Sequence, residues 1–257
     1  MSILSGDAAR IGEQALDEEC AKRHHLVIAL SGAHAYGFPS PDSDLDLKAI
    51  HIAPTASLLG LHPPREAYDR LEVIEGVEID YTSNELRGVL GGMLAGNGNY
   101  IERVWGQHLL RTGDELEGLQ ALWSLVISRR VHRHYRGFAS SQRKAFEASE
   151  APTAKKLLYV LRTALTGTHL LRSGELLVDL STVCDEYGFG DARELIEAKK
   201  AGERTVLEPS QCKAWLERLD GLYELLNQSV EKSVLPEEPT GPEALEDWLI
   251  QVRRQHL

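Results

Sequence analysis

The sequence predicts an α+β protein, in which an N-terminal domain that contains strands precedes a C-terminal domain made only of helices. Two observations support this division. Up to about residue 118, short apolar or alternating runs bounded by turn residues lie between helical stretches, which is typical of strands. Beyond that point apolar residues recur only at helical spacing. A chain of 257 residues suits one or two domains, and we predict them at residues 1–118 and 119–257.

The first domain is expected to begin with a helix and two strands. Residues 7–23 place apolar side chains at helical spacing, and residues 25–32 form an apolar run that ends in Ser-Gly, the pattern of a buried strand and a tight turn. In residues 44–52 apolar and polar side chains alternate, which predicts a strand with Asp44 and Asp46 on one face. The elements expected next are a helical turn at 54–60, a hairpin at 70–83 with its turn at Glu75-Gly76, a helix from Ser83 onward to Gly96, and a helix at 100–110.

The second domain shows no strand pattern. Its expected helices are 119–147, 153–173, 191–201, 210–232 and 242–256, with a Pro-rich loop at 235–242 before the last one.

The overall composition is that of a globular protein with an acidic balance. The formal net charge is −11, so the chain should repel a phosphate backbone unless a local basic patch binds it. No run of 18 apolar residues and no signal peptide are visible, so we expect a cytoplasmic protein that does not contact a membrane. The three cysteines, Cys20, Cys184 and Cys212, lack the spacing of a zinc site and are expected to be reduced and structural.

The most informative motif runs from Gly32 to Asp46. Gly32 and Gly37 flank the turn after the first strand, and such a turn exposes backbone N–H groups that form an anion-binding nest for phosphate. Asp44 and Asp46 follow at positions i and i+2 of the next strand, with Cα atoms about 6.5–7 Å apart, so their carboxylates can converge on hard cations.

A third carboxylate on the return strand of the hairpin would complete a metal site. Glu78 and Asp80 share one face of that strand, and either could serve. Three carboxylates can hold two Mg²⁺ ions about 3.5–4 Å apart, with Mn²⁺ as the alternative. A phosphate nest beside such a site is the equipment for nucleotidyl transfer, in which one metal activates the attacking hydroxyl and the other neutralises the triphosphate.

Four segments carry a resemblance to a known family. Residues 31–52 (SGAHAYGFPSPDSDLDLKAIHI) resemble the signature of the DNA polymerase β-like nucleotidyltransferase superfamily. Residues 77–105, 134–142 and 157–176 resemble a bacterial branch of that superfamily that belongs to an RNA repair pathway. The resemblance implies a polymerase β-like minimal core, a mixed sheet flanked by helices, joined to a C-terminal all-helical domain.

The resemblance also implies roles for individual residues. Asp44 and Asp46 would bind both metals. Asp80, preferred over Glu78 on the family pattern, would bind the metal at the attacking hydroxyl and could act as its base. Ser43 would steady the turn that carries the aspartates.

Two positions depart from the family pattern. Ala33 stands where the family usually has Ser, whose hydroxyl contacts the terminal phosphates, and the loss of such a bond costs about 1.5–3 kcal/mol. Lys48 stands where Arg is common. Beside Ala33, His34 is either a phosphate or substrate contact or a loop residue stacked on Tyr36, which we expect to pack under the loop.

The helix expected at 153–173 carries one continuous polar stripe on an otherwise apolar surface. The stripe consists of Lys155, Tyr159, Arg162, Thr166, His169 and Ser173. With Gly32, Ala33, His34 and Ser43, we expect Lys155 and Arg162 of this stripe to bind the nucleotide. The alternative is an ordinary solvated helix face.

The acceptor is predicted less directly than the chemistry. Residues 129–144 contain only basic charges, which could seat an RNA backbone, although these arginines could also pair with the acidic segments 186–208 and 237–247. The leading hypothesis is transfer from an NTP to an RNA end. The alternatives are nucleotidylation of a protein or small molecule, which suits the acidic chain, and a weakly catalytic nucleotide- or RNA-binding module, which suits Ala33.

Overall fold

The computed structural model describes residues 4, 6–200, 202 and 205–257, and the chain divides into two compact units. Unit 1 comprises Met1–His34, Asp44–Ile127 and Glu238–Leu257, and unit 2 comprises Ala35–Ser43 and Ser128–Glu237. The α+β class is confirmed. The division differs from a single boundary at residue 118, because the C-terminal helix returns to unit 1 and residues 35–43 belong to unit 2.

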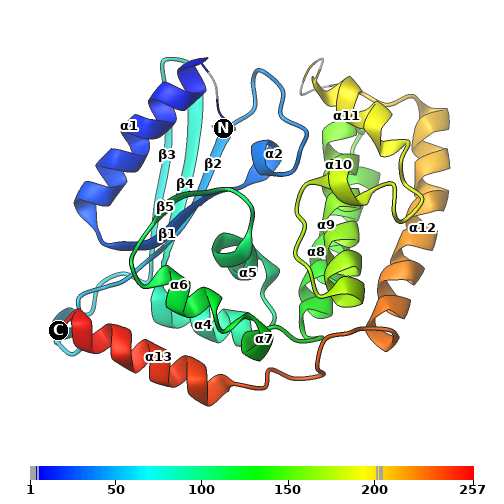
Figure 1. Cartoon of the computed structure of the whole chain (residues 1–257). Coiled ribbons are helices and arrows are strands. Elements are labelled where there is room, and N and C mark those ends of the chain that lie inside the picture. Colours follow the sequence, from blue (N-terminus) through cyan, green and yellow to red (C-terminus); the bar gives the residue numbers. More distant parts are fainter. Residues whose placement is uncertain (1–3, 5, 201, 203–204) are drawn as a thin grey trace. The chain divides into compact units, whose positions relative to one another are not determined.

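Unit 1 is built on a mixed five-stranded sheet with the strand order β3-β4-β2-β1-β5. The strands are β1 (His25–Leu30), β2 (Leu45–His51), β3 (Ala67–Ile74), β4 (Val77–Glu85) and β5 (Leu109–Thr112), drawn in Figure 1. β2 and β4 pair in parallel, whereas the other neighbouring strands are antiparallel. All six residues of β1 are buried, as expected from its continuous apolar sequence.

The helices of unit 1 cover both faces of the sheet. They are α1 (Gly6–Lys22), α3 (Thr55–Leu58), α4 (Leu86–Leu94), α5 (Gly98–Trp105), α6 (Leu116–Gln120), α7 (Trp123–Val126) and α13 (Pro242–Gln255). Arg23, directly after α1, donates a hydrogen bond to the hydroxyl of Tyr81, and Arg103 of α5 donates to Asn84 Oδ1. Because Tyr81 and Asn84 point to opposite faces of β4, α1 and α5 lie on opposite sides of the sheet.

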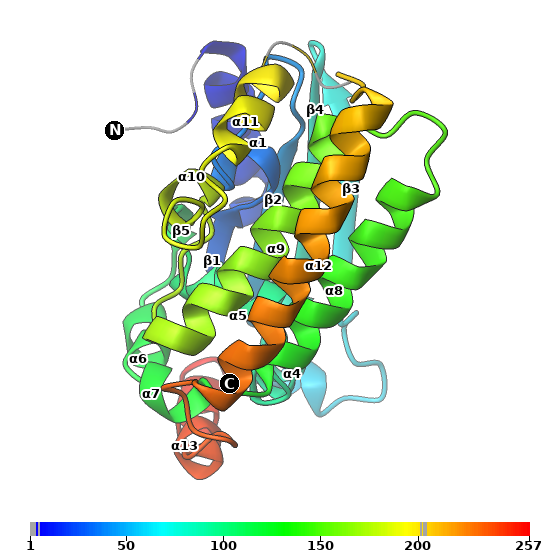
Figure 2. The same ribbon diagram turned by 90° about the vertical axis from the view of Figure 1, so that its right-hand side faces the viewer.

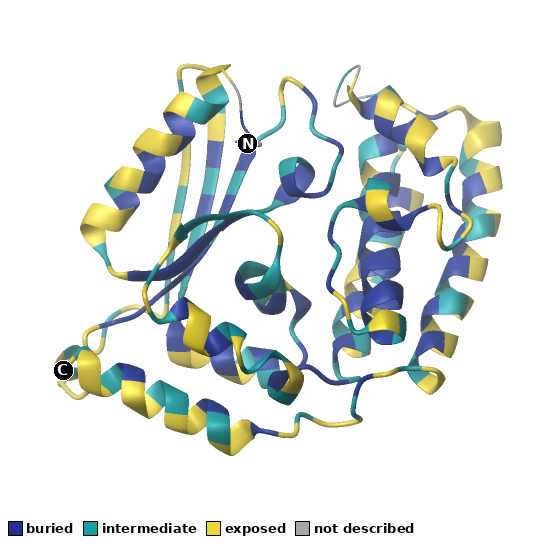
Figure 3. Cartoon of the chain, viewed as in Figure 1, coloured by how far each residue is buried: buried dark blue, intermediate teal, exposed yellow. Residues whose placement is uncertain are grey.

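Unit 2 is a helical bundle arranged around α9 (Ala154–Ser173), as Figure 2 shows. The other helices are α8 (Val131–Glu147), α10 (Leu180–Val183), α11 (Ala192–Lys200) and α12 (Pro209–Glu231), and all four contact α9. Every residue from Val160 to Leu171 is buried, so α9 is dark blue along most of its length in Figure 3. A helix that is apolar on nearly all sides is therefore the core of this unit.

Three expectations for the elements were wrong. Residues 109–110 belong to β5 and not to a helix, because α5 ends at Trp105 and the residues of β5 pair with β1. Ser83 to Glu85 continue β4, and α4 starts only at Leu86. The helix expected at 119–147 is interrupted twice, between α6 and α7 and between α7 and α8. In the second break the backbone N–H of Arg129 donates to the carbonyl of Pro236.

The short connections follow the expected turn chemistry. Glu75 and Gly76, which join β3 to β4, have φ angles of 49° and 85°. Two positive φ angles in a two-residue hairpin loop match the right-handed twist of the strands.

Among the helices of the described residues, none combines the length and apolarity needed to cross a membrane.

Candidate active site

Asp46 and Asp80 lie opposite each other on the neighbouring parallel strands β2 and β4. Lys48 Nζ lies 2.9 Å from Oδ1 of Asp80 and 3.9 Å from Oδ1 of Asp46. All three side chains are partly open to solvent, with exposed fractions of 24% for Asp46, 44% for Asp80 and 20% for Lys48. The sheet thus brings together two of the three predicted carboxylates and one cationic group.

The register of the hairpin separates Asp80 from its rival Glu78. Glu78 pairs only with Val73 of the edge strand β3, because the pairing of β2 with β4 begins at Leu45 and Ile79. Its side chain is exposed. Asp80 is therefore the acidic residue of β4 that faces Asp46 across a strand pair, and this geometry favours it as the third carboxylate.

The Asp46 carboxylate lies directly against the backbone of Gly32. The φ of Gly32 is +63°, and a Cβ at this position would lie 1.8 Å from Asp46 Oδ2. The backbone N–H of the preceding Ser31 donates a 2.9 Å hydrogen bond to the carbonyl of Asp46. The sequence suggested that Gly32 lets the backbone approach a phosphate. In the structure the backbone at Gly32 approaches the side chain of Asp46 instead.

The predicted phosphate nest takes the form of one helical turn, α2 (Gly32–Ala35). Ala33 is buried, with 4% of its surface exposed, and His34 is half-buried. The structure therefore places both residues in the turn next to Asp46's strand. Their contact with a nucleotide stays a prediction.

Ser43 closes the turn that leads to Asp44. Its backbone N–H donates to the carbonyl of Ser40, and its hydroxyl accepts a 2.9 Å hydrogen bond from the backbone N–H of Ser40. The ammonium group of Lys199, on α11 and fully buried, donates to the hydroxyls of Ser43 at 2.8 Å and Ser40 at 2.6 Å. Sequence reasoning missed Lys199, because no local pattern connects it to a turn more than 150 residues away.

Asp44 itself lies one residue before β2 and is half-buried. The ligand oxygens of Asp44, Asp46 and Asp80 are not all within 4.8 Å of one another. The structure thus shows Asp46 and Asp80 sharing one cation, Lys48, while Asp44 follows the Ser40–Ser43 turn.

The segment between the two halves of the motif packs into unit 2. A Cβ at Gly37, where φ is +84°, would lie 2.0 Å from Asp179 Oδ1, and the carbonyl of Tyr36 accepts a hydrogen bond from Leu180 N. Tyr36 is 8% exposed, and the guanidinium carbon of Arg162 lies 3.5 Å from its ring centroid. The expectation that Tyr36 is a packing residue is confirmed.

The middle of the polar stripe of α9 is buried, whereas Ser173 at its end is exposed. Arg162, Thr166 and His169 are 2%, 0% and 6% exposed. Stacking on Tyr36 favours a packing role for Arg162, and its expected contact with a triphosphate stays a prediction. Lys155, at the start of the helix, is half-buried. The pKa of Asp42 is lowered, mainly by a hydrogen bond from Ser40, and the charge of Lys155 makes a smaller contribution.

The basic stretch 129–144 divides between structural and exposed residues. Arg129 donates to the carbonyls of Leu235 and Ser233, and Arg143 pairs with Glu147 and Asp220. These partners of Arg143 lie outside the acidic segments expected to neutralise the stretch. Other residues of α8 remain exposed, namely Arg133, Arg136, Phe138 and Lys144.

The donor set around Asp46 suits a hard divalent cation. Carboxylate oxygens are the protein ligands that Mg²⁺ prefers. Two of them already converge on the ammonium nitrogen of Lys48, so the local charge accommodates a cation at this place. Asp44, Asp46 and Asp80 would hold such an ion.

Comparison with known proteins assigns the chain to a family. The model of a family described as RlaP, RNA repair pathway DNA polymerase beta family, matches residues 10–251. The chain therefore belongs to this family of polymerase β-like nucleotidyltransferases. It is 28% identical over 221 residues to an uncharacterized protein of Methanocaldococcus jannaschii, covering 84% of this chain and 88% of that one.

A solved structure is also similar to the chain. It is the crystal structure of a nucleotidyltransferase-like protein from Exiguobacterium sibiricum, with a TM-score of 0.33 and 11% sequence identity, covering 95% of this chain and 78% of that one.

Proposed function

We propose that this protein transfers a nucleoside monophosphate from an NTP to the hydroxyl of an RNA end and releases pyrophosphate. The observation that carries the proposal is the placement of Asp46 opposite Asp80 on paired strands, with Lys48 within 2.9 Å of Asp80, in a chain that belongs to a nucleotidyltransferase family of an RNA repair pathway. Paired carboxylates on adjacent strands can hold the metal ions that stabilise the attacking and leaving oxygens in phosphoryl transfer.

The roles of the residues follow from their positions. Asp44, Asp46 and Asp80 would hold Mg²⁺, which, when bound, offsets the charge of the triphosphate and favours the ionised form of the attacking hydroxyl. Lys48 balances the two carboxylates, and its Nζ also lies 3.4 Å from the carbonyl oxygen of Asp80. The Asp80 carboxylate, the more exposed of the two, would accept the proton of an acceptor hydroxyl.

Ser43 and Gly32 serve as positioning residues. Ser43 fixes the turn that ends at Asp44 through its bonds to Ser40 and Lys199. Gly32 lets the backbone after β1 pack directly on Asp46. Both act on the orientation of the carboxylates, which must be held closely for metal-dependent catalysis.

The exposed side of α8 supports RNA as the acceptor. His134 stacks on Phe138 with ring centroids 5.7 Å apart, and Phe138 is 41% exposed. Arg133 and Lys144 are exposed on the same helix. Exposed basic and aromatic side chains together can contact the phosphates and bases of a single strand.

Incubation of the protein with α-labelled NTPs, Mg²⁺ and a panel of acceptors tests the proposal. We expect label on RNA ends, and we expect RNA binding to fall steeply with salt because it depends on phosphate contacts. Label only on protein or on a small hydroxylated molecule would favour nucleotidylation of that acceptor in place of RNA. The net charge of −11 suits such an acceptor. No transfer to any acceptor would contradict the proposed activity and leave a binding module.

A further inference from the structure

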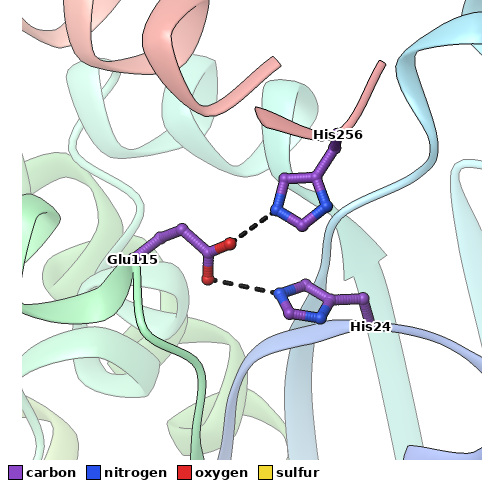
Figure 4. A group of neighbouring side chains, drawn as sticks. All are labelled: His24, Glu115 and His256. Atoms are coloured by element: carbon purple, nitrogen blue, oxygen red, sulfur yellow. Dashed lines mark hydrogen bonds and ion pairs between the residues drawn. The ribbon is translucent and has the colours of Figure 1, made fainter. Parts of the chain in front are cut away.

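A second group of possible metal ligands lies in unit 1, formed by His24, Glu115 and His256 (Figure 4). Nε2 of His256 lies 2.5 Å from Glu115 Oε1, and Nε2 of His24 lies 3.2 Å from Glu115 Oε2. The two imidazole rings have centroids 4.6 Å apart. Among the residues that the structure describes, this is the one set of three such side chains whose ligand atoms are within 4.8 Å of one another.

Backbone hydrogen bonds to one short segment hold both histidines. The carbonyl of His24, just before β1, accepts a 2.9 Å hydrogen bond from Ile52 N. The carbonyl of His256, at the end of α13, accepts a 2.8 Å bond from Thr55 N. Because Ile52 and Thr55 are three residues apart, the two imidazoles are brought to the same point at the end of β2.

Glu115 is held on the opposite side by the chain that leaves β5. A Cβ on the nearby Gly113 would lie 2.6 Å from the carbonyl oxygen of His25 and 3.0 Å from Glu115 Oε2, so the backbone passes closely beneath the carboxylate. The side chain of Glu115 is 10% exposed. Burial raises the pKa of this carboxyl, but hydrogen bonds from His256 and His24 outweigh that effect and the net pKa is lowered.

The group remains open to solvent on the side of the histidines. His256 is 21% exposed and His24 is 45% exposed. Glu115 also borders a surface pocket of about 430 Å³, which is lined as well by Trp248 and Gln255 of α13. An ion and a further small ligand can therefore reach the group without unfolding of the surrounding helices.

We propose that His24, Glu115 and His256 bind one Zn²⁺ ion. Two imidazole nitrogens and one carboxylate oxygen form a donor set that zinc accepts, with a fourth position left for water. Bonds of about 2.0–2.2 Å in tetrahedral geometry place ligand atoms about 3.3–3.6 Å apart. The ligand atoms now lie within 4.8 Å of one another, so small side-chain rotations bring them to these separations.

Zinc binding would replace the hydrogen bonds between the histidines and Glu115 by bonds to the metal. Each hydrogen bond to the carboxylate requires a proton on Nε2 of the histidine that donates it. On zinc binding these nitrogens become ligands, each ring keeps or gains its proton at Nδ1, and any excess proton is released to solvent.

This site is separate from the carboxylates of the proposed active site. His24 lies beside Ile52, after the end of β2, whereas Asp46 lies near its start. At about 3.3 Å per residue the six residues from Asp46 to Ile52 span about 20 Å. The oxygen-only set at Asp46 favours Mg²⁺, and the nitrogen-rich set at His24 favours zinc.

Zinc at this place would tie the C-terminal helix to the sheet. The ligands come from the residue before β1, the chain between β5 and α6, and the residue after α13. α13 is otherwise held near this end by the ion pair of Arg253 with Glu85. Bound zinc should therefore raise the thermal stability of the whole of unit 1.

Zinc titration of the full chain by calorimetry, in excess Mg²⁺ to saturate the carboxylate site, tests the proposal. We expect one zinc ion per chain, a rise in Tm with zinc, and at least tenfold weaker binding in Glu115→Gln and His24→Gln. Glu115→Gln preserves the shape of the side chain, and His24→Gln alters an exposed residue, so at least one variant should fold. His62→Gln, which alters an exposed histidine of another loop, should bind zinc like the wild type.

Two results would overturn the proposal. One is zinc affinity that is absent from the wild type, or equal in the wild type and in both site variants. The other is a thiolate charge-transfer band after replacement of zinc by Co²⁺, which would assign the binding to Cys20, Cys184 or Cys212. A site of nitrogen and oxygen ligands gives no such band.

Discussion

Asp46 and Asp80 are register partners in the parallel pairing of β2 with β4. Neighbouring strands are about 4.8 Å apart, so side chains on the same face of such partners point in the same direction and lie within reach of one ion. This relationship converts two acidic residues that are distant in sequence into a pair, and it distinguishes Asp80 from Glu78, which lies beyond the end of the β2 pairing.

Asp80→Asn should lower nucleotidyl transfer by at least about 10²-fold, because it removes a carboxylate from the proposed metal site. Glu78→Gln, two residues away on the same face, should retain the activity. Glu78 is exposed and Asp80 is partly exposed, so each change should alter the free energy of unfolding by less than about 1 kcal/mol. Steady-state transfer assays on both variants make the comparison, and a larger loss in Glu78→Gln would exchange the assigned roles.

Gly32→Ala should impair both stability and activity. The φ of +63° is unfavourable for alanine, and the new Cβ would lie 1.8 Å from Asp46 Oδ2, so the carboxylate must move. We expect a loss of about 1–3 kcal/mol in the free energy of unfolding, measured in urea. Gly88→Ala is the matched control, because Gly88 lies in α4 and the new Cβ would meet nothing within 4 Å beyond its own helix backbone, so the change should be neutral or stabilising. Equal effects of the two changes would contradict the close approach.

Lys199→Met should loosen the turn before Asp44. The buried ammonium group donates to the hydroxyls of Ser40 and Ser43, and hydrogen bonds to charged groups are worth about 1.5–3 kcal/mol. We therefore expect a destabilisation of that order, together with a lower kcat. Lys200→Met alters an exposed neighbour that pairs with Glu197 and should have little effect on either quantity. A Lys199→Met protein with unchanged kcat would show that the turn does not position Asp44.

Stability should fall between pH 6.5 and pH 4 because of two buried histidines. Burial, assisted by the charge of Arg23, lowers the pKa of His25 to about 4, and burial likewise lowers the pKa of His51 to about 4. The unfolded chain binds protons near pH 6.5 and the folded chain only near pH 4, so acid favours unfolding by at most about 3 kcal/mol for each ring.

Urea unfolding at several pH values measures this dependence. His51→Gln should flatten the slope of stability against pH, while the exposed His62→Gln should leave it unchanged. A slope that is the same in all three proteins would mean that His51 does not contribute.

The sequence predicted the parts of the fold that local pattern controls. The alternation in residues 44–52 and the Glu75-Gly76 turn led to β2 and the hairpin, because strand faces and hairpin turns depend on neighbouring residues. β5 was missed because its four residues become a strand only through pairing with β1. Partition of residues 35–43 into unit 2 depends on contacts with α9 and α10 and has no local signal.

The site shows the same contrast. Asp44 and Asp46 follow from their spacing, and Asp80 required the family resemblance until the register of β4 supported it. No local motif marks Lys199, because its partner Ser43 is 156 residues away. The same holds for His24, Glu115 and His256, which are far apart in the sequence. Arg162, which the stripe on α9 suggested as a phosphate ligand, is stacked on Tyr36, in the part of the stripe that faces the unit's own core.

The most direct test of the proposed activity is transfer of label from an α-labelled NTP to RNA by the wild type and by Asp46→Asn, with Mg²⁺ and with EDTA. We predict transfer by the wild type with Mg²⁺, none with EDTA, and a loss of about 10³-fold or more in Asp46→Asn with an unchanged circular dichroism spectrum. Transfer by Asp46→Asn at the wild-type rate would contradict the assignment of catalysis to these carboxylates.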